Sequence, residues 1–456
     1  MDAILFAIAL LLLFTAGLGT LLLLVPRDHS LTVIETLSLA IIFGAAFVSL
    51  TSFYLGLFLS GLTLRSTLTA LCIIMGGAGI AARRSAINIV WSRHSGICAL
   101  LPMGILAFQT GLISWLAFHL TLGWDGLIVW EVKARLACLN GGVVPIDFFS
   151  DPSRYRMHPE YPLFLPLVET WIYSWLGRCD QSMAKLISPL FYLSALGLLY
   201  TGGSRLGGRW WQGFLPAFLL FFVPLVIVGE GSVSSGYADF PLAVFYLASV
   251  VYLLEYGRTG SKGAIYILGI SAAVLPWIKQ EGIILWLCLL VLTTVKTVQR
   301  RSVREVLAMV LPGILVFGSW RISLALVEAP VGLDFLPFNL TIFWSNFSRS
   351  TAIAQAVVNE MMNWQHWSLL WPGVILSLIL LLVNKRRKDF AVLLLTVILP
   401  IIIDSGIFIF SAWSPFMDHF NSSMSRLLLQ VSLGGLLIIG LAIPIDKKWG
   451  YWGKGK

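Results

Sequence analysis

The chain has few charged residues and few cysteines for its length. Charged residues make up 12% of the 456, and the five cysteines form no CxxC pair and no zinc-site spacing. A soluble protein of this size needs far more polar surface, so the composition excludes an ordinary soluble fold. Cys138 and Cys179 lie outside the hydrophobic runs, where two unpaired thiols are favoured over one disulfide.

Motifs of several enzyme classes are also missing. The sequence has no HExxH and no DxD pair, and GGSRLGGR at 202–209 lacks the Lys-Ser/Thr of a P-loop. No internal repeat is found, which counts against a repeat-built transporter. The net charge of +9 comes from basic residues in short loops between hydrophobic runs. The positive-inside rule explains that placement, so no nucleic-acid partner is expected.

Long hydrophobic runs dominate what remains. Hydrophobic residues are 58% of the chain and lie in runs of roughly 17–25 residues, the length that crosses a hydrocarbon core. The sequence therefore predicts an all-α polytopic membrane protein with about thirteen transmembrane helices, the first of them retained rather than cleaved. The expected crossings are 4–25, 33–60, 66–82, 97–120, 183–201, 212–229, 240–254, 264–277, 283–295, 306–327, 367–383, 390–411 and 424–443.

Lys and Arg in short loops orient these crossings. The positive-inside rule places the C-terminal tail in the cytoplasm and the segment 121–182 on the extracytoplasmic side of a plasma (inner) membrane. Within it, 163–177 is aromatic and too short to span, so an interfacial helix is expected there, as in the long loop 328–366. The predicted organisation is a three-helix addition at 1–82, a transmembrane module at 83–443 and a basic tail at 444–456.

Four polar motifs fall on the same predicted face. They are WD at 124–125, HPEYP at 158–162, GYADFP at 236–241 and KQEG at 279–282. A concentration of charge outside the bilayer of a membrane protein indicates a substrate site. In order and sidedness these motifs resemble the GT-C superfamily of membrane glycosyltransferases, which includes the protein O-mannosyltransferases and the lipid A aminoarabinose transferases.

The resemblance implies transfer of a sugar from a polyprenyl-phosphate carrier to an extracytoplasmic acceptor, with inversion at the anomeric carbon. Such a reaction needs a base beside the acceptor hydroxyl, and Asp125 fits that role, although an N-cap is the alternative. Glu160 matches a second charged group at the donor in relatives. His158 and Tyr161 are then expected to contact substrate, or else to pack a proline-flanked turn.

The leaving phosphate needs cations, because its negative charge grows in the transition state. Lys279, near a turn that in relatives is often Lys-Gly-Pro-like, is the leading candidate; here the turn reads KQEG, and a Lys279–Glu281 turn that snorkels to the interface is the alternative. Arg426, near the outer end of the last helix, is the second. Asp239 is expected to bind the acceptor or to cap a helix, and Glu281 is expected to bind substrate.

No cofactor is indicated with certainty. Histidines near the outer face leave a divalent metal open, although none shows ligand spacing; they are His119, His158, His366 and His419. The expected partners are a polyprenyl-phosphate-linked sugar, a lipid, glycan or protein acceptor, and membrane lipids. Two other functions stay open, a transporter or flippase for a lipid-linked sugar and an oligosaccharide polymerase or ligase.

Overall fold

The computed structural model describes residues 1–26, 29–83, 89–90, 97–300, 302–330, 332–383 and 387–443. Within them the chain is helical, and β structure is limited to one parallel two-residue pairing of β1 (Leu31–Thr32) with β2 (Ile89–Val90) and one isolated bridge. The predicted all-α class is therefore confirmed.

The longer helices are α1 (Asp2–Leu24), α2 (Val33–Gly56), α3 (Gly61–Arg83), α4 (Ile97–His119), α9 (Ser188–Gly207), α10 (Trp210–Leu219), α12 (Asp239–Thr259), α13 (Lys262–Ile278), α14 (Gly282–Arg300), α15 (Val303–Leu326), α17 (Arg349–Met361), α19 (Leu370–Val383), α20 (Arg387–Ile407) and α21 (Phe416–Ala442). Shorter pieces are η1 (Gly126–Glu131), α5 (Val132–Leu139), α6 (Ile146–Ser150), η2 (Pro152–Met157), α7 (Phe164–Leu176), α8 (Gln181–Ala184), η3 (Lys185–Ile187), η4 (Leu220–Phe222), α11 (Pro224–Ile227), α16 (Leu340–Ser345), α18 (Trp364–Trp367) and η5 (Phe408–Phe410).

Eight helical segments of the described chain are long and apolar enough to cross a membrane. Five further apolar helices, in α4, α10, α13, α14 and α19, have 10–17 residues in the part assessed, short of a full crossing. The protein is therefore a multi-pass membrane protein. The count of thirteen crossings stays a prediction, although each predicted segment coincides with one of these helices.

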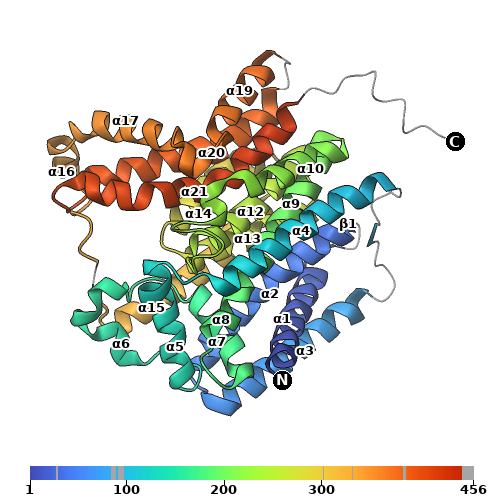
Figure 1. The fold of residues 1–456 in the computed structure, drawn as a ribbon, viewed down its shortest axis with the longest axis vertical. Helices are drawn as coiled ribbons and strands as arrows, with labels where there is room; N and C mark the ends of the chain where they lie inside the picture. Colours follow the sequence, from blue (N-terminus) through green and yellow to red (C-terminus); the bar gives the residue numbers. More distant parts are fainter. Residues whose placement is uncertain are drawn as a thin grey trace.

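The helix ends gather on two opposite faces of the bundle. In Figure 1 the short helices α6 and α16 lie at the left and β1 lies at the right. We call the face that carries α6 and α16 the loop face, and the opposite face, which carries β1, the strand face. The N-terminus belongs to the loop face, because Arg178 donates to Asp2 at 2.6 Å, and Gly61 N, at the start of α3, donates to Gly141 O at 2.6 Å.

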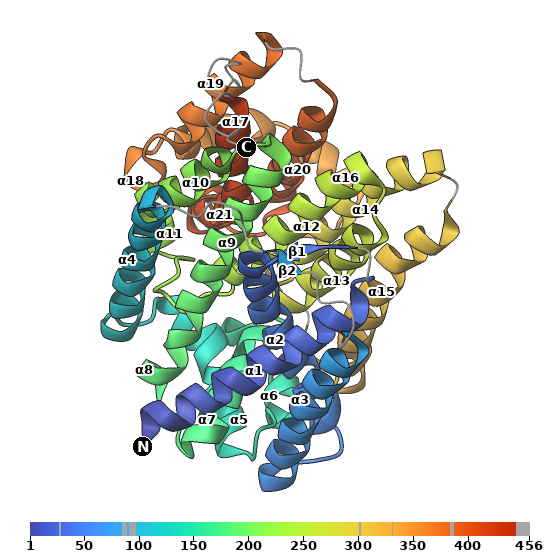
Figure 2. The ribbon, with the colours of Figure 1, turned by 90° about the vertical axis from the view of Figure 1, so that its right-hand side faces the viewer.

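The three N-terminal helices pack into the bundle and do not stand apart from it. Figure 2 shows α1 running beside α3, and α2 contacts both α7 and α9. The indole of Trp171 donates to Ala9 O at 3.0 Å, and that of Trp277 donates to Ser49 Oγ at 2.9 Å. The helix α2 begins at a complete capping box made by Thr32 and Glu35. Residues 1–82 thus help to hold the elements that carry the polar motifs.

The predicted interfacial helices differ from each other. The helix α7 is too short to span, as expected, but most of its residues are buried because α1, α2 and α5 cover it. In contrast, α16 has no buried residue and exposes Leu340 and Trp344, as an interfacial helix does. Near α7 the structure pairs Cys138 with Cys179 in a disulfide with Cα atoms 6.1 Å apart, so the favoured pair of free thiols is wrong.

Candidate functional site

The Trp-Asp loop after α4 is fixed against the segment that precedes α12. Gly123 N donates to Ser235 O at 2.9 Å, and Asp125 N donates to the Tyr237 hydroxyl at 3.1 Å. A Cβ at Gly126 would lie 2.2 Å from Ser235 O, so only glycine permits this approach. A π-helical turn, η1, follows directly, a form that occurs frequently at functional sites.

Asp125 pairs with Arg426 across 301 residues of sequence. Arg426 Nη1 donates to Asp125 Oδ2, and the guanidinium also lies 5.5 Å from the centre of the Tyr237 ring. The Asp125 side chain makes no capping hydrogen bond at the start of η1, so the N-cap interpretation is wrong. With 28% of its side chain exposed, this carboxylate stays accessible from the loop face.

Lys279 lies at the break between α13 and α14 and points into the protein. Its ammonium donates to Asp239 at 2.8 Å and to Glu281 at 3.0 Å, and 3% of its side chain is exposed. Gln430, one turn beyond Arg426 on α21, donates to the same Asp239 oxygen at 2.9 Å. Lys279 therefore does not snorkel, and Asp239 binds neighbouring side chains rather than capping α12.

The HPEYP motif forms a tight turn that brings its polar side chains together. His158 adopts a left-handed conformation with φ 46°, and its Nδ1 lies 3.1 Å from Glu160 Oε1. Its ring stacks on Tyr161 with centroids 4.6 Å apart. Glu160 O accepts hydrogen bonds from Trp320 at 3.2 Å and from Gln280 at 3.4 Å, which tie the turn to the KQEG break.

Tyr161 connects this turn to the two ion-paired groups. Burial, together with the negative charges of Glu281 and Glu160, raises the pKa of its hydroxyl well above the usual range. Arg426 and Asp125 also interact with it electrostatically. The hydroxyl therefore stays protonated at neutral pH and can donate a hydrogen bond.

Lys133 of α5 is a fully buried cation beneath the same turn. Its ammonium donates to His158 O at 2.6 Å and lies 5.6 Å and 5.8 Å from the ring centres of Trp130 and Tyr161. Burial lowers the pKa of Lys133 to about 7, although Glu160 opposes the shift. This lysine anchors the carbonyl of the strained residue His158.

These side chains form one assembly, the loop-face cluster. The structure brings together all the predicted site residues, which are Asp125, His158, Glu160, Tyr161, Asp239, Lys279, Glu281 and Arg426, and it adds Lys133, Tyr237 and Gln430. Four buried polar atoms of the cluster have no hydrogen-bond partner in the described part of the chain: Asp239 Oδ2, Glu281 Oε2, Arg426 Nε and Gln430 Oε1. Buried polar atoms usually have a partner, so these four atoms call for a water or ligand atom that would satisfy them.

Gln430 and Asp404 also lie at the site, and the sequence marks both of them although neither belongs to the four polar motifs. Gln430 lies four residues after Arg426 and so shares its helix face. Asp404, a buried acid that interacts electrostatically with Lys279 and Glu281, is a lone carboxylate within an apolar run. Only the tertiary packing reveals the burial of Lys133, because nothing in its local pattern separates it from a surface lysine.

A second ionic assembly, the strand-face cluster, lies at the opposite ends of the helices. Arg205 of α9 pairs with Glu35 of α2 at 2.5 Å and with Glu255 of α12 at 3.0 Å. The Tyr252 hydroxyl also donates to Glu35, and His29 lies 3.9 Å from Glu255. This cluster ties the N-terminal helices to the bundle.

No group of three or more His, Cys, Asp and Glu side chains is placed to hold a metal ion among the residues that the structure describes. His366 lies 2.6 Å from Glu360, and His419 lies 3.0 Å from Ser411 Oγ. His119 instead contacts the carbonyl of Trp115. The histidines of the predicted outer face thus have separate partners.

Comparison of the chain with models of protein families, with curated proteins and with solved structures finds no match.

Proposed function

We propose that the protein is a glycosyltransferase of the GT-C type, which moves a sugar from a polyprenyl-phosphate carrier to an acceptor hydroxyl at the loop-face cluster. The acceptor oxygen attacks the anomeric carbon, and its proton passes to Asp125. The bond between the anomeric carbon and the phosphate oxygen breaks with inversion, and polyprenyl phosphate leaves. Lys279 and Arg426 stabilise the charge that grows on that phosphate.

One observation carries this proposal. The Trp-Asp loop, the HPEYP turn, the start of α12, the KQEG break and the last helix are far apart in sequence, yet their side chains meet in one cluster. The cluster offers an accessible carboxylate as base, with cations a few ångströms away. General acid-base chemistry on an anionic donor needs these two kinds of group.

The charge balance of the cluster suggests how the donor enters. The carboxylates Asp125, Asp239 and Glu281 pair with the cations Lys279 and Arg426. A donor phosphate could bind the unpartnered Arg426 Nε directly, or exchange with a carboxylate at either cation. The sugar hydroxyls then meet the remaining carboxylates as hydrogen-bond donors.

The proposal places the loop face on the extracytoplasmic side of a plasma (inner) membrane. The Cys138–Cys179 disulfide supports this side, because disulfides persist in oxidising compartments. Two exposed positions test it, Ser150 near the end of α6 and Lys262 at the start of α13. In intact cells a membrane-impermeant maleimide should label Ser150→Cys and should label Lys262→Cys only after permeabilisation. Labelling of both from outside would refute the orientation.

Lipid-linked intermediates test the reaction itself. A strain that lacks the protein should accumulate one polyprenyl-phosphate monosaccharide, detected by mass spectrometry of lipid extracts, and the wild-type chain should remove it. The flippase alternative predicts accumulation that is confined to the cytoplasmic leaflet, and the polymerase alternative predicts accumulation of oligosaccharide-linked pyrophosphate. An unchanged lipid profile would contradict the proposal.

A further inference from the structure

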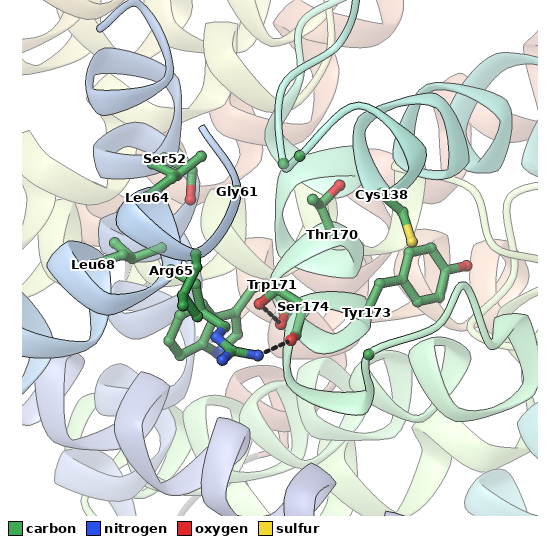
Figure 3. Close-up of a pocket in the computed structure, with 14 residues that line it drawn as sticks. Ser52, Gly61, Leu64, Arg65, Leu68, Cys138, Thr170, Trp171, Tyr173 and Ser174 are labelled. Carbon is green, nitrogen blue, oxygen red and sulfur yellow. Dashed lines mark hydrogen bonds between the residues drawn. The ribbon is translucent and has the colours of Figure 1, made fainter. Parts of the chain in front are cut away.

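A cavity of about 320 Å³ lies on the loop face and shares no residue with the loop-face cluster (Figure 3). It is enclosed by the end of α2, the first turns of α3, the end of α5 and one side of α7. Gly141 forms part of its wall. This residue has a φ of 69°, and a Cβ there would lie 2.9 Å from Gly61 N, so glycine is required at this position. The N-terminal helices therefore meet the segment 121–182 around this space.

Arg65 is the charged residue of the cavity wall. Its Nη1 donates to Ser174 O at 2.8 Å, and its guanidinium lies 5.9 Å from the centre of the Trp175 ring. Within the described residues no carboxylate lies within 4.0 Å of Arg65, whereas Arg178 on the same face has two, Asp2 and Asp180. A guanidinium has five N–H donors, so Arg65 keeps donors for an anionic ligand, and its planar fork suits a phosphate.

The rest of the wall is largely apolar, with Ser52 and Thr170 among the polar residues that line it. Leu64, Leu68 and Trp171 line the cavity, and Leu62 lies at its rim with 69% of its surface exposed. Arg65 lies one turn inside the loop-face end of α3, and the orientation inferred from the charged loops would put that turn near the lipid headgroups.

We infer that this cavity is a binding site for an anionic phospholipid, with the headgroup phosphate on Arg65 and the start of one acyl chain against Leu64 and Leu68. The volume fits a headgroup and the first carbons of a chain, and the rest of the chain stays in the bilayer. The lipid would join α3 to α7 and so fasten the N-terminal helices to the segment that carries the HPEYP turn. This inference does not depend on the proposed reaction.

Thermal unfolding of the purified, delipidated protein in detergent tests the site. Dioleoylphosphatidylglycerol should raise the Tm of the wild-type protein, because a ligand that binds only the folded state stabilises it. Arg65→Ala should weaken the apparent affinity about tenfold or more, and Arg65→Lys should weaken it less. The matched control is Arg178→Ala, which removes an arginine that already has two carboxylate partners and should leave the lipid response intact.

Two further arms separate the sources of the phosphate group. Inorganic phosphate and dioleoylphosphatidylcholine should each give a much smaller rise in Tm than dioleoylphosphatidylglycerol. Leu68→Trp keeps the Arg65 cation and fills the cavity, so it should also reduce the rise in Tm with lipid. If Arg65→Ala does not fold, this variant tests the site in its place. An equal response in Arg65→Ala or Leu68→Trp and the wild type, or an equal effect of inorganic phosphate or phosphatidylcholine, would overturn the inference.

Discussion

The loop-face and strand-face clusters are both buried networks of opposite charges, yet they differ in access. In the strand-face cluster the side chains of Glu35 and Glu255 are 2% and 9% exposed. In the loop-face cluster those of Asp125 and Glu281 are 28% and 24% exposed, although Asp239 is fully buried; the exposed member of the strand-face cluster is instead a cation, Arg205, at 30%. Within the described residues the strand-face cluster also contains a buried polar atom without a hydrogen-bond partner, Arg205 Nε, so unsatisfied atoms alone do not distinguish the clusters. The exposure of the carboxylates does distinguish the clusters, because a carboxylate that acts as a base must be reached by the substrate.

The two clusters also differ in what holds them. The strand-face network joins the first turn of α2 to the last turns of α9 and α12, and Glu35 also belongs to the capping box of α2, so its charges tie packed helices together. The loop-face network is built from a loop, a turn with a residue at positive φ and helix ends, and it includes carboxylates that are partly exposed. We therefore expect substitutions at the loop face to change turnover and those at the strand face to change stability.

The largest expected effect is at Asp125. Asp125→Asn keeps the shape of the side chain and removes the basic carboxylate, so turnover should fall on the order of 10²–10⁴-fold while the protein still inserts and binds donor. Clearance of the lipid-linked sugar in a complemented deletion strain, at matched protein abundance, measures this. Near-normal clearance would remove Asp125 as the base and direct attention to Glu160 or Asp239.

A slightly smaller effect is expected at Lys279. Lys279→Ala leaves the buried carboxylate of Asp239 without its cation, which should weaken donor binding strongly and cost about 3–5 kcal/mol of stability. Lys279→Arg retains the charge and should lose donor use only in part. The matched control is Lys185→Ala, a buried lysine whose ammonium donates to Leu120 O and makes no ion pair with a carboxylate of the cluster within the described residues. Full donor use per folded molecule in Lys279→Ala would exclude Lys279 from the mechanism.

Arg205 should affect stability rather than turnover. Arg205→Ala leaves Glu35 and Glu255 facing each other without a cation, at a cost of about 3–5 kcal/mol. Denaturation in detergent measures the loss, and clearance of lipid-linked sugar per folded molecule should remain close to that of the wild type. If stability is unchanged and turnover is lost, the division between the two clusters is wrong.

A further expected effect concerns Lys133 and depends on pH. Its pKa of about 7 in the folded protein is below the value of 10.5 for the free side chain, so the unfolded chain holds more protons between these values. The contribution of Lys133 to stability therefore rises with pH across that window. The free energy of unfolding of Lys133→Met, relative to wild type, should fall as pH is raised from 7 toward 10. A difference that does not vary with pH would contradict the burial of a titrating amine.

The membrane class and the residues that gather at the loop face could be predicted from the sequence, whereas the contacts between those residues could not. Apolar runs dictate helices, since backbone groups must be satisfied inside lipid, and isolated charges near helix ends mark Lys279 and Arg426. The partners of these charges depend on how the helices pack, so the pairing of Asp125 with Arg426 could not be read from spacing. The burial of α7 could not be predicted for the same reason, because the helices that cover it, α1, α2 and α5, come from other parts of the sequence.

The central claim is that the loop-face cluster, and not the strand-face cluster, receives the lipid phosphate. A polyprenyl phosphate with a diazirine beside the phosphate, photolysed with the purified protein, tests it by peptide mass spectrometry. The account predicts adducts on the peptides that contain Asp125, Lys279 and Arg426, and their loss when excess unlabelled polyprenyl phosphate is present. Adducts confined to peptides around Glu35 and Arg205, or adducts at the loop face that excess ligand does not displace, would contradict it.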